Sequence, residues 1–128
     1  MAALRALIVD DHLLFAEALR LTLELDERVE VVGTAQNGKE GVRMALALRP
    51  DAVVMDLEMP VLDGVHATRL LRRLVPGCGV VVLTSSCSPE DAFRARRAGA
   101  AGYLNKGCAI EYVVEALVEA AAVDPLAA

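Results

Sequence analysis

Four short runs of mainly apolar residues are each followed directly by a polar side chain. The runs span residues 6–9, 52–55, 80–83 and 102–105. Each run is short enough to be a strand that is buried on both faces of a parallel sheet. The polar residues that follow the runs are Asp10 with Asp11, Asp56, Thr84 and Lys106. Because ligands bind at the carboxyl ends of the strands in open α/β sheets, we expect these side chains to meet in one crevice.

Strand-like and helix-like segments alternate five times along the 128 residues. This alternation is typical of an α/β protein with a doubly wound, five-stranded parallel sheet and helices on both faces. The length fits a single domain, residues 1–128, with a core from about residue 4 to residue 122 and a tail at 123–128. Strands are predicted near residues 4–10, 29–35, 52–56, 80–84 and 102–105.

The predicted helices differ in the apolar surface that they offer. The fourth, at residues 89–97, contains three arginines and few large apolar residues, so it should be weakly anchored and able to move. The first helix is expected to turn these residues toward the core: Leu14, Phe15, Ala18, Leu19 and Thr22. The last helix is expected to bury Ile110, Val113, Val114 and Leu117.

The composition argues against two classes of protein. Hydrophobic residues make up 55% of the chain, yet no stretch approaches the ~20 uninterrupted apolar residues of a membrane span, and no signal peptide is recognised. A net charge of −5 argues against a nucleic-acid surface, so the chain would reach DNA only through a separate domain. Cys78, Cys87 and Cys108 form no CxxC pair and are expected to be reduced. We therefore expect a cytoplasmic protein without membrane contact.

The three aspartates at the expected crevice carry like charges that need a counter-ion. Asp10, Asp11 and Asp56 would lie within a few ångströms of one another, which is costly unless a cation neutralises them. Oxygen ligands with room for water or phosphate suit Mg²⁺ better than Zn²⁺, and no histidine or cysteine directly follows these runs. We expect Mg²⁺ to be held by Asp11 and Asp56, with Asp10 orienting a bound water.

Asp56 is also the best candidate for a nucleophile. Carboxylates form aspartyl-phosphate intermediates, and phosphoryl transfer depends mainly on positioning and charge. The Lys106 ammonium can pair with one phosphoryl oxygen while the Thr84 hydroxyl donates to another. Taken singly, an aspartate here is commonly a helix cap, a threonine a strand residue and a lysine a surface charge. Because all these residues stand at strand ends, a single phosphoryl-transfer site is favoured over separate structural roles for each of them.

Four motifs resemble the receiver domain of two-component response regulators, the CheY-like family. They are VDDH at residues 9–12, MDLEMPVLDG at 55–64, LTS at 83–85 and GYLNK at 102–106. The resemblance covers about residues 4 to 122. The wording of VDDH and GYLNK, together with VVGTAQNG at residues 31–38, is most similar to the NarL/FixJ subgroup, whose receivers usually precede a LuxR-type helix-turn-helix domain.

The resemblance implies a fold and a set of ligands. The fold would be flavodoxin-like, with strand order 2-1-3-4-5. Asp56 would accept a phosphoryl group from a phosphohistidine on a sensor histidine kinase. Asp10, Asp11, Asp56 and the backbone carbonyl of Glu58 would hold Mg²⁺.

The resemblance also implies how the phosphoryl group is sensed. Thr84 and Lys106 would bind its oxygens, and Tyr103 would turn inward when Thr84 is drawn toward the phosphate. Such a domain is a signalling switch and not an enzyme, since it catalyses only its own phosphorylation and slow dephosphorylation. A second copy of the chain is a candidate partner.

Other residues near the crevice have open roles. The Glu58 side chain either reaches the metal region or is an ordinary exposed loop glutamate. Ser86, two residues after Thr84, lies where it can affect hydrolysis of the phosphoryl group. His12 and His66 are expected to have surface or packing roles.

Three functions remain to be distinguished. The first is the regulatory half of a transcriptional regulator whose DNA-binding domain is absent from this chain, and the second is a stand-alone receiver that relays phosphate or binds proteins. The third is a hydrolase of the haloacid-dehalogenase type. The sequence disfavours the third function, because those sites resemble Asp-x-Asp after the first strand, whereas here Asp56 follows the third and Glu58 comes two residues later.

Overall fold

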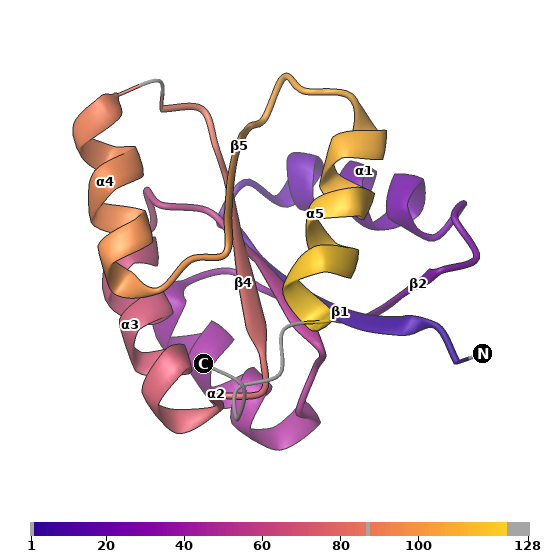
Figure 1. Cartoon of the computed structure of the whole chain (residues 1–128), viewed down its shortest axis with the longest axis horizontal. Coiled ribbons are helices and arrows are strands. Elements are labelled where there is room, and N and C mark those ends of the chain that lie inside the picture. Colours follow the sequence, from indigo (N-terminus) through magenta and orange to yellow (C-terminus); the bar gives the residue numbers. More distant parts are fainter. Residues whose placement is uncertain (1, 87, 123–128) are drawn as a thin grey trace.

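The computed structural model describes residues 2–86 and 88–122, which form a five-stranded parallel sheet with helices on both faces (Figure 1). The strand order is β2-β1-β3-β4-β5, which confirms the predicted doubly wound fold. The predicted tail at 123–128 and Cys87 lie outside the described residues. The strands are β1 (Leu4–Val9), β2 (Val29–Ala35), β3 (Ala52–Met55), β4 (Gly79–Thr84) and β5 (Gly102–Asn105). The helices are α1 (Leu13–Leu23), α2 (Gly38–Leu48), α3 (Gly64–Leu74), α4 (Pro89–Ala98) and α5 (Ile110–Ala122).

Alternate residues of the central strands face opposite layers of helices. In β1, Ala6 and Ile8 belong to the core shared with α1 and α5, whereas Leu7 and Val9 belong to the core shared with α2 and α3. Successive side chains of a strand point to opposite faces, so a strand that is covered on both sides needs a continuous apolar run. Figure 1 shows α1 and α5 on one side of the sheet and α2, α3 and α4 on the other.

The buried face of α1 differs from the predicted one. Phe15 packs against the core and Leu19 is buried, as expected, but Ala16 and Leu23 complete the face. The predicted core residues that are exposed instead are Leu14, Ala18 and Thr22. Leucines stand on all sides of this helix, so apolar spacing alone could not select the side that meets the sheet.

Three helices begin at side-chain caps. The side chains of Asn37, Asp63 and Ser88 accept hydrogen bonds from the backbone N–H groups of Glu40, His66 and Asp91, at 2.8, 3.0 and 3.4 Å respectively. Each cap satisfies a backbone donor that the first turn of a helix leaves unpaired. The caps follow β2, β3 and β4, so they define how the chain leaves the carboxyl edge of the sheet.

A close backbone approach shapes the loop after β3. A Cβ atom at Gly64 would collide with the backbone oxygen of Asp56, and the Gly64 N–H donates to the Leu57 oxygen at 2.9 Å. Only glycine leaves room for this contact. The start of α3 is therefore held directly against the residue that follows β3.

Little apolar surface anchors α4. Ala95 and Ala98 are its buried residues, and the large Phe93 side chain is 62% exposed. The structure thus agrees with the sparse packing that the sequence predicts for this helix. Among the residues that the structure describes, no helix combines the length and the apolar character needed to cross a membrane.

Candidate functional site

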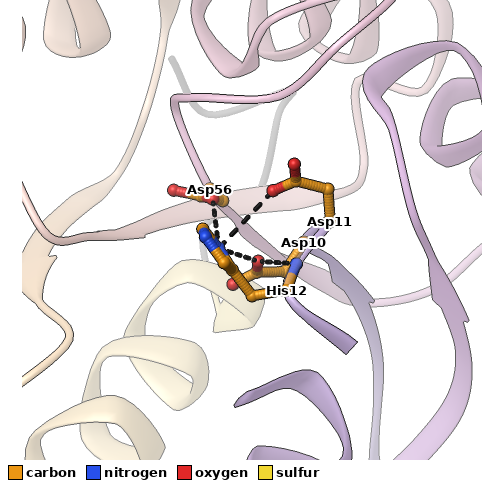
Figure 2. A group of neighbouring side chains, drawn as sticks. All are labelled: Asp10, Asp11, His12 and Asp56. Atoms are coloured by element: carbon orange, nitrogen blue, oxygen red, sulfur yellow. Dashed lines mark hydrogen bonds and ion pairs between the residues drawn. The ribbon is translucent and has the colours of Figure 1, made fainter. Parts of the chain in front are cut away.

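Three carboxylates converge at the carboxyl edge of the sheet. Asp10 and Asp56 follow β1 and β3, which are paired neighbours, and Asp11 comes next in the chain. The backbone N–H of Asp10 donates to the carbonyl oxygen of Ala35 at 2.9 Å, and that of Asp56 donates to the carbonyl oxygen of Val9 at 3.0 Å. Backbone hydrogen bonds to the neighbouring strands therefore continue to both aspartates. Asp10 is 4% exposed and Asp56 is 2% exposed, whereas Asp11 is partly exposed. Figure 2 shows the three carboxylates around one small space.

Lys106, the residue after β5, places its ammonium beside these carboxylates. Its Nζ atom lies 2.9 Å from Asp10 Oδ2 and 3.4 Å from Asp56 Oδ2. The same atom lies 4.6 Å from the centre of the Phe15 ring. The backbone N–H of Lys106 donates to the backbone carbonyl oxygen of Thr84 at 2.9 Å. These contacts hold a positive charge next to Asp56.

The environment of Asp56 disfavours its charged form. Burial raises the pKa of the Asp56 carboxyl above its ordinary value, and the Asp10 carboxylate raises it further. Lys106 and a backbone hydrogen bond from Glu58 lower the pKa, but they do not cancel the rise. Since an additional cation would favour the charged form, the carboxylates are arranged to gain from one.

One carboxylate oxygen lacks a hydrogen-bond partner. Among residues 2–86 and 88–122, Asp11 Oδ1 is one of the buried side-chain polar atoms without a hydrogen bond. It belongs to a group of potential ligand atoms, from Asp10, Asp11, His12 and Asp56, that lie within 4.8 Å of one another. Carboxylate oxygens are the ligands that Mg²⁺ prefers. The residues present therefore fit the divalent cation that the sequence predicts.

Glu58 lies at the rim of this group. Its side chain is exposed, and it lines a groove of about 450 Å³ together with Asp11 and with Asp91 and Arg94 of α4. The groove connects the carboxylates with the face of α4, so a partner that reaches Asp11 can also contact that helix. The role of the Glu58 backbone carbonyl as a metal ligand stays a prediction.

His12 joins the carboxylates, which the sequence analysis missed. Its ring is exposed, as expected for a surface residue, yet Nδ1 lies 3.2 Å from Asp10 Oδ1, 3.5 Å from Asp11 Oδ1 and 3.8 Å from Asp56 Oδ2. The Asp10 carboxylate accepts a 2.9 Å hydrogen bond from the His12 backbone N–H, which turns the residue back toward the strand end. The only signal in the sequence was its position two residues after Asp10.

His66 behaves as expected. It lies in the first turn of α3, and its Nδ1 contacts Asp63 Oδ1 at 2.9 Å. The side chain is exposed. The His66 ring therefore contacts the residue that caps α3, and among the described residues it is not part of the group of potential metal ligands.

Thr84 is connected to α4 through a chain of polar contacts. Thr84 is fully buried at the end of β4, and its Oγ1 accepts a hydrogen bond from the Ser86 N–H at 3.2 Å. The Ser86 hydroxyl donates to Asp91 Oδ2 in α4 at 2.6 Å. The Tyr103 hydroxyl donates to the backbone carbonyl oxygen of Ser86 at 3.3 Å. A displacement of Thr84 therefore has a short polar route to the first turn of α4.

The sequence matches the family model of the response regulator receiver domain over residues 6–118, which is most of the chain. The chain belongs to the response regulator receiver family. The receiver is 41% identical over 116 residues to the response regulator GacA of Pseudomonas aeruginosa, covering 89% of this chain and 53% of that protein. It is 35% identical over 122 residues to the transcriptional regulatory protein LiaR of Bacillus subtilis, covering 95% of this chain and 58% of that protein.

Solved structures agree with this assignment. The receiver superimposes on the signal receiver domain of the response regulator NarL from Mycobacterium tuberculosis with a TM-score of 0.90 and 30% identity, over 94% of this chain and 98% of that one. The similarity to NarL-type and LuxR-type regulators that the motifs indicated is confirmed. The receiver spans about half the length of the curated relatives GacA and LiaR. Receiver domains are signalling domains that bind Mg²⁺ at an acidic pocket.

Proposed function

We propose that this receiver is a Mg²⁺-dependent phosphorylation switch in which Asp56 accepts the phosphoryl group. The observation that carries the proposal is the position of Asp56, which is buried between a lysine ammonium and two further carboxylates at one sheet edge. The Asp56 carboxylate thus has the Lys106 ammonium on one side, and on the other side the Asp10 and Asp11 carboxylates, which can bind a metal ion. Nucleophilic attack by a carboxylate on phosphorus needs both kinds of charge neutralisation.

Asp10, Asp11 and Asp56, with the Glu58 carbonyl, are the residues that would hold Mg²⁺. When it is bound, Mg²⁺ supplies charge neutralisation for a phosphoryl oxygen. The chain's own step is the attack of an Asp56 carboxylate oxygen on phosphorus. As that oxygen–phosphorus bond forms, the phosphorus–nitrogen bond of the phosphohistidine donor breaks, and the histidine nitrogen keeps the electron pair.

Lys106 and Thr84 would recognise the product. The Lys106 ammonium, now paired with Asp10 and Asp56, can transfer one of its hydrogen bonds to a phosphoryl oxygen. The Thr84 hydroxyl can donate to another oxygen, and any movement of its side chain would act on the Ser86 N–H, from which it now accepts a hydrogen bond. Tyr103 and Asp91 both contact Ser86, so the change would be transmitted to β5 and α4.

Histidine kinases are the phosphoryl donors of two-component systems, so we propose a sensor histidine kinase as the partner of this receiver. We further propose an output in transcription through a separate DNA-binding domain. Two facts support this output: LiaR is a transcriptional regulatory protein, and the acidic net charge of −5 makes the receiver itself a poor surface for DNA.

Intact-mass analysis after incubation with acetyl phosphate and Mg²⁺ tests the proposal. We expect one added phosphoryl mass in the wild type and none in Asp56→Asn or after removal of Mg²⁺ by a chelator. Asp63→Asn is the matched control, because Asp63 lies on the same loop but caps α3, and it should gain the mass normally. A wild type that binds Mg²⁺ but gains no mass, or an Asp56→Asn variant that does gain it, would refute the assignment.

A further inference from the structure

Helices α3 and α4 carry a concentration of positive charge in an acidic chain. Residues 64–98, which run from the start of α3 to the end of α4, contain six arginines and two acidic residues, so they have four positive charges in excess. The whole chain has 18 acidic residues and 13 lysines and arginines, so 16 and seven of them lie elsewhere and leave nine negative charges in excess there. The two helices lie side by side on one face of the sheet (Figure 1). The basic surface is therefore confined to one part of the receiver.

A groove of about 370 Å³ lies between these two helices, and we call it the arginine groove. The residues that line it come from both helices and are Val65, His66, Arg69, Phe93, Arg94 and Arg97. The Phe93 side chain is mostly exposed, and the Arg97 guanidinium lies 5.8 Å from the centre of its ring. A cation at this distance over a ring face is attracted to it. The groove thus places an exposed aromatic ring beside a positioned positive charge.

Two of the three guanidinium groups at the groove have no carboxylate partner in the part of the chain that the structure describes. Arg94 lies 3.9 Å from Asp91, whereas neither Arg69 nor Arg97 forms an ion pair within residues 2–86 and 88–122. Both side chains are exposed. An unpaired guanidinium keeps all its donors in the planar fork that matches a carboxylate. Arg69 and Arg97 can therefore each pair with an incoming anion.

Arginines elsewhere on the surface are neutralised within the chain. Arg20 of α1 pairs with Glu17 at 2.5 Å and with Glu24 at 2.9 Å. Arg28 pairs with Asp26 and with Glu115, each at 3.0 Å. Lack of a partner is thus a feature of the arginine groove and not of every arginine in this acidic protein.

We propose that the arginine groove binds a short acidic segment of a partner protein, whose carboxylates pair with Arg69 and Arg97 and whose apolar side chain covers Phe93. Interfaces gain affinity from a few aromatic and arginine side chains, and complementary charge speeds association. None of the carboxylates around Asp56 lines the groove, so the inference goes beyond the proposed function and does not depend on it.

The extent of the basic surface favours a short acidic segment over a nucleic acid. Arg69 and Arg73 stand four residues apart on α3, and Arg94 and Arg97 stand three apart on α4, so each pair lies on one face of its helix. At 1.5 Å per residue, each pair extends over only about 6 Å. A nucleic-acid strand carries its phosphates well beyond this length and would be repelled by the acidic remainder of the receiver. A few carboxylates in one segment meet only the arginines.

Fluorescence anisotropy with a labelled synthetic peptide of glutamates around one leucine tests the inference. We expect saturable binding to the wild-type chain that weakens as salt is added, and no binding of the same peptide with glutamine in place of glutamate. Arg69→Gln and Arg97→Gln should each weaken binding roughly tenfold, because each removes a charge-assisted hydrogen-bonded pair. Phe93→Ala should weaken it roughly fivefold. All three side chains are exposed, so the variants should fold, which urea unfolding checks.

Arg20→Gln is the matched control, because Arg20 is a helical arginine that already has carboxylate partners, and it should leave the affinity unchanged. Absence of saturable binding, or an equal loss in Arg20→Gln and Arg97→Gln, would overturn the inference. Tighter binding of single-stranded oligothymidylate than of the glutamate peptide would also overturn it and assign the groove to nucleic acid. Self-association that Arg97→Gln abolishes, measured by analytical ultracentrifugation, would overturn it in favour of a second copy of the chain.

Discussion

Helices α4 and α5 lie on opposite faces of the same edge of the sheet but are anchored very differently. Helix α5 buries Val113, Val114 and Leu117 in the larger core, whereas α4 contributes two buried alanines. The side chains that tie α4 to the crevice are polar, namely Asp91 to Ser86. Helix α4, which a polar contact connects to the crevice, is thus held in place by less apolar burial than α5.

This difference shows how a small event at a buried carboxylate can have a distant effect. Local opening and displacement are easiest where few apolar contacts must be broken. A change in the hydrogen bonds of Thr84 and Ser86 therefore has a larger effect on α4 than on α5. Four measurements test the difference between α4 and α5.

The largest effect should come from truncating the α5 anchor. Leu117 is fully buried, and Leu117→Ala should lower the free energy of unfolding by about 2–5 kcal/mol, because a cavity replaces the lost side chain. In α4, Phe93→Ala should change it by less than about 0.5 kcal/mol, since that ring is mostly exposed. Urea unfolding measures both, and a Phe93→Ala loss as large as that of Leu117→Ala would remove the contrast.

A smaller effect should follow from breaking the polar tie. Ser86→Ala removes the hydroxyl that donates to the Asp91 carboxylate, and a hydrogen bond to a charged group contributes about 1.5 kcal/mol at the low end of its usual range. We expect hydrogen exchange at the α4 amides to become roughly tenfold faster, with little change in α5. The exposed neighbour Ser85→Ala is the control. Equal acceleration in both helices would show that the tie is not specific to α4.

Paired cap substitutions should give an effect of about 1 kcal/mol each. Asn37 caps α2 and Ser88 caps α4, both through a side-chain oxygen that accepts a backbone N–H. Asn37→Ala should lower the global stability seen in urea unfolding. Ser88→Ala should instead appear mainly as faster exchange in α4, because that helix opens locally before the domain unfolds. A full loss of global stability in Ser88→Ala would mean that α4 unfolds with the core.

The smallest effect should be a pH dependence at the site, because Lys106 offsets part of the effect of burial on Asp56. A carboxyl whose folded pKa is raised contributes stability below its ordinary value of 3.8 and loses it as the pH rises through the folded pKa. As the pH rises from 3.8 through the folded pKa of Asp56, the wild type should therefore lose stability relative to Asp56→Asn. Urea unfolding at several pH values measures the difference.

Asp63 supplies the control of opposite sign. Burial raises the pKa of Asp63, but hydrogen bonds from His66 outweigh burial and lower it overall. Its contribution to stability is therefore present above the ordinary value and is lost as the pH falls through the lowered pKa. Asp63→Asn should remove this acid-side loss. Parallel pH curves for the wild type and Asp56→Asn would contradict the shift at Asp56.

The parts of the fold that sequence reasoning predicted well are those with strong local signals. Strands covered on both faces need continuous apolar runs, so β3 and β4 could be recognised directly. The capping residues Asn37 and Asp63 are of types whose side chains bond to backbone N–H groups at helix starts, so caps of this kind are local features of the sequence. Parallel strands end at one edge, so the meeting of Asp10, Asp56 and Lys106 followed from their positions after the runs.

The parts that it missed depend on tertiary geometry. The side of α1 that meets the sheet is chosen by the direction of the chain after β1, which a helix with leucines all around does not encode. The approach of His12 to the carboxylates depends on one backbone hydrogen bond to Asp10. That bond is invisible in the sequence, where His12 is simply the third residue after a strand.

The placement of Lys106 has a consequence for the order of events at the site. Asp10, Asp11 and Asp56 bring three negative charges and Lys106 one positive charge, so the group carries two negative charges in excess. One divalent ion brings this balance to neutrality, and an incoming phosphoryl group then meets no net repulsion. We therefore expect metal binding to precede phosphoryl transfer, and the phosphoryl group, once attached, to hold the ion more tightly than the free receiver does.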